Sequence, residues 1–388
     1  MKRVLSLVIF LLFLLVGCTK SEKTVFDLGI TNCSILDVNS GTIQENGTIV
    51  INNNKIIDVV FDNSKKYLFK ETLDINNQYI LPGFINTHVH LCSSDDYIQL
   101  QKWVKYGVTA VRTLNDFDNC TLTNVKSELN SDNNNCTLLT STPIITKPNG
   151  YGHYFIDSIT EAIESVEHHV PLGVDVIKIS IEDYINRKTY NMLELDEIKA
   201  ITKTAHANNL KVTAHVTNSY NIPLVLDGNV DEIAHMIIGN VSDDDIKALI
   251  DKGVTWIPTM ELWKGVSNKY TLDCYDIAID NLRRFYNAGG TVVFGTDYDG
   301  FDINFDDKFP ITEVISYKEA GMSNIDIIRS ATINAAKSCN IEKKLGSIDQ
   351  GKIADLIICK ENPLENIEGL TDLSYVIHNG QIISHLNN

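Results

Sequence analysis

The chain has 388 residues, 44% of them hydrophobic, so it is too apolar for a disordered protein and long enough to bury a large core. That length suits one large barrel domain with a small accessory domain, or two to three domains of ordinary size. The formal net charge of -17 argues against nucleic acid and anionic lipid as binding partners, but it excludes no class of small substrate.

The first residues have the features of a bacterial export signal. A positively charged start is followed by an apolar run over residues 4–16, and Leu15-Val16-Gly17-Cys18 has the order of a lipobox. The run is too short for an ordinary membrane-spanning helix. We therefore expect residues 1–17 to be a lipoprotein signal peptide, Cys18 to carry the lipid and residues 18–24 to be a tether. The protein would then be lipid-anchored to the cell membrane on its extracytoplasmic face. An uncleaved anchor and a signal cleaved without lipidation are the alternatives.

The remaining cysteines predict no disulfide framework and no metal site. They are odd in number and form no C-x-x-C pair, so neither a disulfide scaffold nor a cysteine metal site is indicated. Cys120 and Cys136 flank an Asn- and Asp-rich stretch. Either a disulfide between them or two free thiols fits the sequence.

The order of elements predicts two kinds of structure. Short strand-like pieces joined by turns fill residues 25–60, which predicts an antiparallel β module. From residue 82, apolar strands alternate with amphipathic helical stretches, the pattern of repeated βα units. The expected strands cover residues 84–90, 108–112, 138–140, 176–179, 212–215, 232–235, 254–258 and 291–297. The helices expected between them include residues 97–106, 160–170, 194–208 and 242–252.

This pattern predicts an α/β fold. Eight βα units of this total length are typical of a (β/α)8 TIM barrel, which we place at residues 82–344. Strand-like residues return after Gly346, with a hairpin turn at Asn379-Gly380. We expect the two chain ends, residues 25–81 and 345–388, to form one small β-sandwich beside the barrel.

Polar side chains stand in or at the end of five of the apolar strands, where an aliphatic residue is usual. Period-two alternation puts the two histidines of the first strand on one face. Because a barrel gathers its active site at the carboxyl ends of its strands, we expect all of these side chains to meet there, and imidazoles side by side are typical of part of a metal site. A lone histidine in such a place is more often a core residue, so convergence is the deciding property. The candidates are His88, His90, Lys178, His215, His235 and Asp297.

Lys178 is the least expected residue of this set. A lysine inside a buried strand is costly unless it is paired or neutralised. It can reach the barrel mouth, or pair with Asp175 or Glu182. Alternatively it is carbamylated by carbon dioxide, which gives a carboxylate that can bridge two metal ions.

The chain resembles the amidohydrolase superfamily in its binuclear form, over nearly the whole mature chain. The resemblance rests on Pro82-Gly83-Phe84-Ile85-Asn86-Thr87-His88-Val89-His90 and on residues 107–112, 176–178, 214–215, 233–235, 295–297 and 346–356. It implies one metal held by His88, His90, Lys178 and Asp297, and a second held by carbamylated Lys178, His215 and His235. It also implies two divalent ions, zinc before iron, manganese or cobalt, with a hydroxide bridging them. Lys178 and Asp297 are the implied catalytic residues, Asp297 as the proton carrier.

Within the superfamily, the chain is most similar to imidazolonepropionase-like and Xaa-Pro dipeptidase (prolidase)-like members. Those proteins often place a substrate-binding histidine after the third strand, where this chain has His153; the alternative is a surface histidine. Many prolidase-like members have a tyrosine where this chain has Thr217, with Tyr220 slightly later as a second substrate-binding candidate. This departure puts a dipeptide specificity in doubt.

The sequence therefore predicts a membrane-anchored, metal-dependent hydrolase that cleaves the carbon–nitrogen (amide) bond of a small molecule, cyclic amide or short peptide. One alternative is a mononuclear deaminase- or imidazolonepropionase-like hydrolase, in which Lys178 is not carbamylated. The other is a non-catalytic binding lipoprotein on the same scaffold. Loops set the substrate in such barrels, so substrate identity is left open, as is the oligomeric state.

Overall fold

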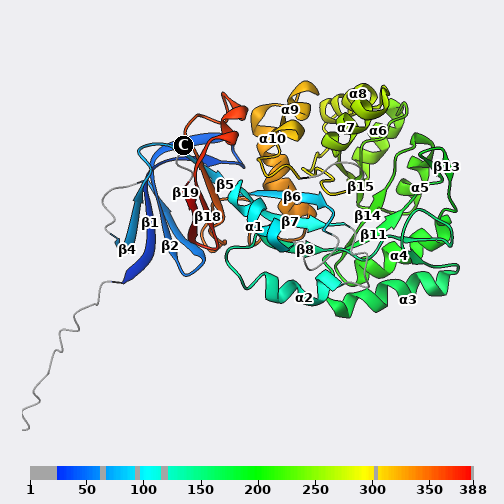
Figure 1. Cartoon of the computed structure of the whole chain (residues 1–388), viewed down its shortest axis with the longest axis horizontal. Coiled ribbons are helices and arrows are strands. Elements are labelled where there is room, and N and C mark those ends of the chain that lie inside the picture. The colour runs from blue at the N-terminus through cyan, green and yellow to red at the C-terminus, as the bar shows by residue number, and fades with distance from the viewer. Residues whose placement is uncertain (1–23, 62–66, 92–96, 115–120, 301–304, 386–388) are drawn as a thin grey trace, which may run out of the picture.

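The computed structural model describes residues 24–61, 67–91, 97–114, 121–300 and 305–385. A mixed sheet built from both chain ends lies at one side, and parallel strands with flanking helices form the rest (Figure 1). The expected signal peptide, Cys18 and the tether up to residue 23 lie outside the described residues. Within the described ranges, every helix is too short or too polar to span a membrane.

The two chain ends share one eight-stranded sheet. Its strands are β1 (Val25–Asp37), β2 (Thr42–Asn52), β3 (Lys55–Val60), β4 (Leu68–Asp74), β5 (Tyr79–Pro82), β17 (Leu356–Cys359), β18 (Leu373–His378) and β19 (Gln381–His385). They lie in the order β19-β18-β17-β5-β1-β2-β3, with β4 beside β1. The antiparallel pair of β17 and β5, from Leu356↔Pro82 to Cys359↔Tyr79, joins the two ends. The association of the ends is as expected, and their packing as a sandwich stays a prediction.

Two details of this terminal module differ from the prediction. The sheet is mixed and not antiparallel, because β4 and β5 both run parallel to β1. Residues 26–30 and 33–36, which the sequence predicts as two separate strand-like pieces, form a single strand, β1. Register shifts on both sides of Cys33 and a φ of 54° at Asn32 mark a bulge in that strand.

Parallel strands make up the two larger sheets after the terminal module. One has the order β6-β7-β8, and the other has the order β10-β9-β11-β14-β15-β16. The short strands β12 (Tyr184–Ile185) and β13 (Lys188–Thr189) form a separate antiparallel pair. All residues of β6, β7 and β11 are buried, as expected where helices cover a parallel sheet. The bounds are β6 (Phe84–Val89), β7 (Val108–Thr113), β8 (Thr137–Thr140), β9 (Ile145–Thr146), β10 (Tyr154–Phe155), β11 (Val176–Ser180), β14 (Lys211–His215), β15 (Glu232–Ala234) and β16 (Thr255–Ile257).

The last expected strand, residues 291–297, is not a regular strand. Instead, its backbone bonds to both neighbours: Val293 N–H donates to Trp256 O (2.9 Å), and Thr87 N–H donates to Phe294 O (3.0 Å). Isolated parallel bridges connect the segment to β16 and β6, and a further bridge connects the residue after β8 to β11. Asp297 has a φ of 64°, which ends the extended conformation.

Helices surround the parallel strands (Figure 1). The four that the sequence predicted are present, within one residue at each end. Ser158 and Ser242 cap two of them by accepting from Glu161 N–H and Asp245 N–H. The bounds are α1 (Tyr97–Lys105), α2 (Thr121–Leu129), α3 (Ile159–His169), α4 (Leu195–Ala207), α5 (Ile222–Asp227), α6 (Asp243–Asp251), α7 (Met260–Tyr270), α8 (Cys274–Asn287), α9 (Ile311–Glu319), α10 (Asn324–Ala331) and α11 (Ile333–Ser338).

Candidate active site

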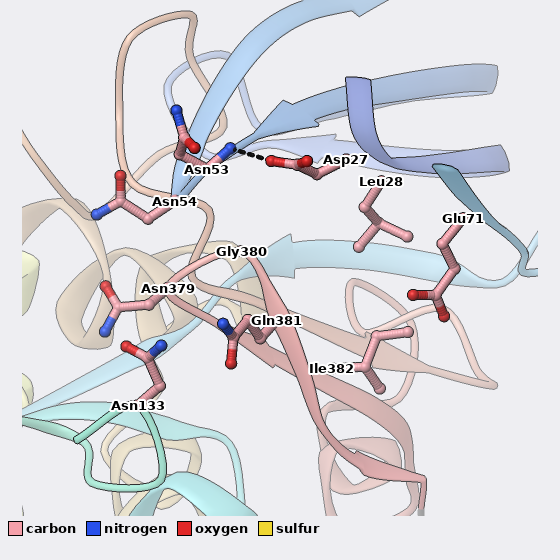
Figure 2. Close-up of a pocket in the computed structure, with 10 residues that line it drawn as sticks. All are labelled: Asp27, Leu28, Asn53, Asn54, Glu71, Asn133, Asn379, Gly380, Gln381 and Ile382. Atoms are coloured by element: carbon pink, nitrogen blue, oxygen red, sulfur yellow. Dashed lines mark hydrogen bonds between the residues drawn. The ribbon is translucent and has the colours of Figure 1, made fainter. Parts of the chain in front are cut away.

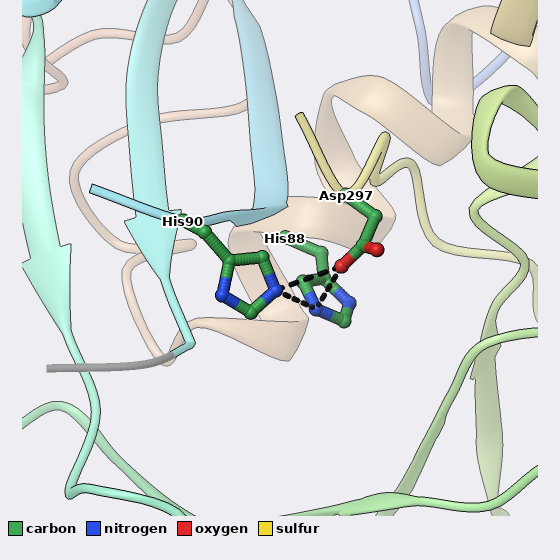
Figure 3. Close-up of side chains that lie close together, drawn as sticks. All are labelled: His88, His90 and Asp297. Atoms are coloured by element: carbon green, nitrogen blue, oxygen red, sulfur yellow. Dashed lines mark hydrogen bonds and ion pairs between the residues drawn. The ribbon is translucent and has the colours of Figure 1, made fainter. Parts of the chain in front are cut away.

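Three of the predicted ligands lie in direct contact. His88 Nε2 lies 3.2 Å from His90 Nε2, and Asp297 Oδ1 lies 2.9 Å from the first and 2.8 Å from the second. Figure 3 shows the two rings and the carboxylate pointing toward one another. His88 and His90 share a face because side chains alternate along β6, and the hydrogen bond from Asp297 N–H to His88 O (2.9 Å) places the aspartate beside them. These three residues can hold a metal ion.

The protonation states of His88 and Asp297 are those that metal binding needs. Burial lowers the pKa of His88 to about 3, so its imidazole is neutral at pH 7. Burial alone would raise the pKa of Asp297, but the imidazoles of His90, His235 and His88 outweigh it and hold that pKa well below 3.8. A neutral imidazole beside an ionised carboxylate is ready to bind a cation without losing a proton.

His215 and His235 lie next to this cluster. The His235 ring centroid is 4.7 Å from that of His88 and 4.6 Å from that of His215. Burial lowers the pKa of both residues, so both are neutral. Thr259 Oγ1 lies 3.0 Å from His235 Nδ1 and fixes the ring, and His215 Nε2 lies 3.5 Å from Glu182 Oε2. The structure therefore brings four histidines and one aspartate to one place.

Lys178 is buried at the same place, with only 1% of its surface exposed. Its Nζ has no hydrogen-bond partner among the described residues. The suggested pairing with Asp175 or Glu182 is absent, because Asp175 pairs with Lys126 (2.7 Å) and Glu182 accepts from Thr217 and Asn218. Burial lowers the pKa of Lys178 to about 7, although the charge of Asp297 opposes that shift. The amine is thus largely desolvated and unpartnered.

The backbone is strained at three residues of the site. His235, Thr259 and Asp297 have φ angles of 72°, 50° and 64°. Such angles are uncommon outside glycine, and rare for a β-branched residue such as Thr259. Strain of this kind costs on the order of 1–3 kcal/mol per residue and clusters at functional sites. The strained backbone therefore agrees with a functional site at these residues.

The two predicted substrate-binding residues and the suggested disulfide have different surroundings. His153 lies within the electrostatic influence of His90, whose charge adds to burial in lowering the pKa of His153. Tyr220 is 60% exposed, and its hydroxyl donates to Asp183 Oδ1 (2.9 Å). Cys136 is a buried free thiol, and its suggested partner Cys120 lies outside the described residues.

The sequence analysis assigned no contact with the histidines to three residues that have one. Glu182 lies beside His215, Thr259 lies beside His235, and the Tyr151 ring stacks on the His215 ring at a centroid distance of 4.3 Å. Glu182 follows the carboxyl end of β11, so a search of strand ends for carboxylates as well as histidines would find it. Tyr151 and Thr259 lie in loops, and no periodic pattern indicates them.

A hollow of ≈ 730 Å³ lies on the terminal module, away from this cluster (Figure 2). It is lined mainly by amide and carboxylate side chains, among them Asp27, Asn53, Glu71, Asn379 and Gln381. None of the six predicted ligands lines it. The candidate active site is therefore identified by its chemistry and not by the size of a hollow.

Several known proteins are similar to this chain. Imidazolonepropionase of Thermoplasma volcanium is 22% identical over 383 residues, which cover 87% of this chain and 91% of that protein. Ochratoxinase of Aspergillus niger is 24% identical over 240 residues, which cover 57% of this chain and 48% of that protein. A crystal structure of a Xaa-Pro dipeptidase with bound methionine in its active site matches with a TM-score of 0.80 and 24% identity, covering 92% of this chain and 99% of that chain.

The structural likeness indicates a TIM-barrel-like α/β fold. The model of the amidohydrolase family matches residues 79–383, which include all six predicted ligands. The chain therefore belongs to the amidohydrolase family, whose members are metal-dependent hydrolases that act on carbon–nitrogen bonds.

Proposed function

We propose that the protein hydrolyses the amide bond of a small molecule, cyclic amide or short peptide, at a site of two divalent metal ions. One ion would be held by His88, His90, Lys178 and Asp297, and the other by Lys178, His215 and His235. The observation that carries the proposal is the buried Lys178 amine, which has no partner among the described residues and lies among neutral histidines and an ionised carboxylate.

The residues present fit such a metal pair. A lysine with an unpartnered Nζ can take up carbon dioxide, and the carbamate offers the two oxygens that a bridging ligand needs. Imidazole and carboxylate donors suit zinc first, and also iron, manganese or cobalt. When bound, the two cations would make a water molecule acidic near neutral pH and polarise the scissile carbonyl.

The chain's own residues have separate tasks in this reaction. The water oxygen bonds to the carbonyl carbon, and the bond from that carbon to nitrogen breaks. Asp297 takes a proton from the water and returns it to the leaving nitrogen. Its low pKa keeps it ionised before the reaction, and its position inside the cluster places it beside the reacting atoms. Thr259 and Glu182 keep the rings of His235 and His215 in place.

A mononuclear hydrolase is the second candidate. It is favoured by one observation: among the described residues, only His88, His90 and Asp297 bring their ligand atoms within 4.8 Å of one another. Lys178 would then remain a free amine. Metal analysis separates the two, because the binuclear site holds two ions per chain and the mononuclear site holds one.

The architecture around this site is a closed (β/α)8 barrel over residues 82–344, with residues 25–81 and 345–388 as a sandwich. The isolated bridges between the two parallel sheets support the closure, as do the bonds of segment 291–298 to β16 and β6. A small apolar cluster supports it too, since Ile85, Ala110, Leu139, Ile257 and Val293 come from both sheets and from that segment.

The mature protein is a lipoprotein on the extracytoplasmic face of the cell membrane. The lipobox order that ends at Cys18 supports this location. Growth of a bacterial expression strain with an alkyne-labelled fatty acid should label the wild type and leave Cys18→Ser unlabelled. Equal labelling of both proteins would refute the location.

A substrate screen tests the function. N-acyl amino acids, Xaa-Pro dipeptides and cyclic amides are incubated with protein reloaded with Zn²⁺, Mn²⁺ or Co²⁺. We expect turnover by the wild type and by Lys203→Ala, which changes an exposed lysine on α4, and a loss of at least about 10³-fold in Lys178→Ala. Full activity of Lys178→Ala, together with protein that contains no metal, would contradict the proposal.

A further inference from the structure

Aromatic side chains gather on the loops at one side of the candidate site. Tyr151 follows β9, Tyr190 follows the hairpin of β12 (Tyr184–Ile185) and β13 (Lys188–Thr189), and Tyr220 follows β14. Phe155, Tyr184 and Tyr220 are 54%, 49% and 60% exposed, which is unusual for such large side chains. All of these loops leave the carboxyl ends of parallel strands, where the histidines lie.

Tyr151 connects this aromatic group with the histidines. Its ring stacks on His215 with an interplanar angle of 28°, and the Tyr190 ring meets it edge-on at a centroid distance of 5.5 Å.

The loop that carries Tyr151 is held rigidly. A Cβ on Gly150 would lie 2.1 Å from Thr146 Oγ1, and a Cβ on Gly152 would lie 2.6 Å from Ile144 O, so glycine is needed on both sides of the tyrosine. Asn191 Nδ2 donates to Pro148 O (2.7 Å) and ties this loop to the neighbouring one. A ring presented this firmly loses little entropy when a ligand packs on it.

We propose that Tyr151 and Tyr190 form a specificity pocket, which takes an aromatic or large apolar substituent of the substrate next to the scissile amide. The inference rests on the proposed function and names its substrate class. One face of Tyr151 is already covered by His215, so a substrate group beside the tyrosine would lie directly next to the reacting atoms. Offset or edge-to-face packing of aromatic rings supplies the attraction.

A binding experiment tests the pocket without turnover. Metal-loaded protein is titrated calorimetrically with 3-phenylpropionate and with acetate, two carboxylates that differ only in the aromatic group and its linker. We expect the wild type to bind 3-phenylpropionate about tenfold more tightly or better. Tyr151→Ala should reduce that ratio to about threefold or less while its acetate affinity and metal content stay within about twofold of the wild type. Tyr151→Phe should keep the ratio, because the ring remains.

Controls separate this pocket from a merely structural role. Tyr270→Ala removes an exposed tyrosine from α7 and should leave both affinities unchanged. Tyr190→Ala gives a second test if Tyr151→Ala fails to fold. A wild type without preference, or an unchanged ratio in both alanine variants, would overturn the inference. Preference for 3-phenylpropionate that depends on Tyr151, in a protein with no activity toward any amide, would refute the proposed function alone.

Discussion

Replacing Lys178 by methionine should stabilise the metal-free protein while it removes the activity. Lys178 is 1% exposed, and burial lowers its pKa from 10.5 to about 7. One pKa unit corresponds to about 1.4 kcal/mol, so keeping this amine in the folded protein at pH 7 costs about 4 kcal/mol as an upper value. Methionine has a similar length and no charge to bury, and such exchanges at buried ionic positions often stabilise by about 1–4 kcal/mol.

The stabilisation by Lys178→Met should depend on pH in a defined direction. The folded pKa of Lys178 is lower than the unfolded one, so between pH 7 and 10.5 the unfolded chain binds more protons at this residue and wild-type stability rises with pH. The advantage of Lys178→Met should therefore be largest at or below pH 7 and should disappear near pH 10.5. Chemical unfolding of chelator-treated protein at several pH values measures it.

A matched control keeps the result specific. Lys203 is exposed on α4, and Lys203→Met should change the free energy of unfolding by no more than about 0.5 kcal/mol at any of these pH values. Lys178→Met should also retain less metal than the wild type. A variant that is no more stable than the wild type in the metal-free state would refute the view that Lys178 is an unpartnered buried amine.

Three further predictions concern other parts of the molecule. Asp297→Asn should lower kcat by about 10²–10⁴ in steady-state assays, because it removes the proton carrier; wild-type kcat in this variant would exclude that role. Burial lowers the pKa of His378, but the Asp355 carboxylate 3.0 Å away outweighs burial and leaves that pKa raised above 6.5. The wild type should thus exceed His378→Asn in free energy of unfolding by the largest amount below pH 6.5, and this difference should shrink as the pH rises through the folded pKa. Urea unfolding measures the difference, and an increase with rising pH would contradict the prediction. Glu313→Ala should lower the free energy of unfolding by about 2–4 kcal/mol, because this buried side chain of α9 accepts from the first two N–H groups of α7. Glu319 is an exposed residue of α9, and Glu319→Ala should lower it by about 0.5 kcal/mol or less.

The hydrophobic periodicity of the sequence predicted the placement of side chains that lie on regular helices and strands. The alternation of residues 84–90 placed His88 and His90 on one face, and their Nε2 atoms lie 3.2 Å apart. The four helices expected at residues 97–106, 160–170, 194–208 and 242–252 were equally predictable, because each has an apolar face that recurs at helical spacing. The pairing of β17 with β5 was expected as an association of the chain ends, since neither end has enough strands to bury its own apolar face.

Loop geometry was not predictable in the same way. Segment 291–297 was expected as a strand from its apolar residues. Its backbone bonds to both neighbouring strands, but the left-handed conformation of Asp297 ends the extended conformation. The stacking of Tyr151 on His215 joins a residue of the loop after β9 with the last residue of β14, and single-sequence patterns carry no information on such contacts. The mixed direction of the terminal sheet was missed for a related reason: the partner of a strand depends on topology and not on its own residues.

Anomalous scattering from crystals grown with zinc tests the account most directly. We expect two peaks per chain, one next to His88, His90 and Asp297 and the other next to His215 and His235. Continuous electron density should extend from Lys178 Nζ to a position between the two peaks. A map without a peak at His88, or with Lys178 directed away from the histidines, would contradict the account.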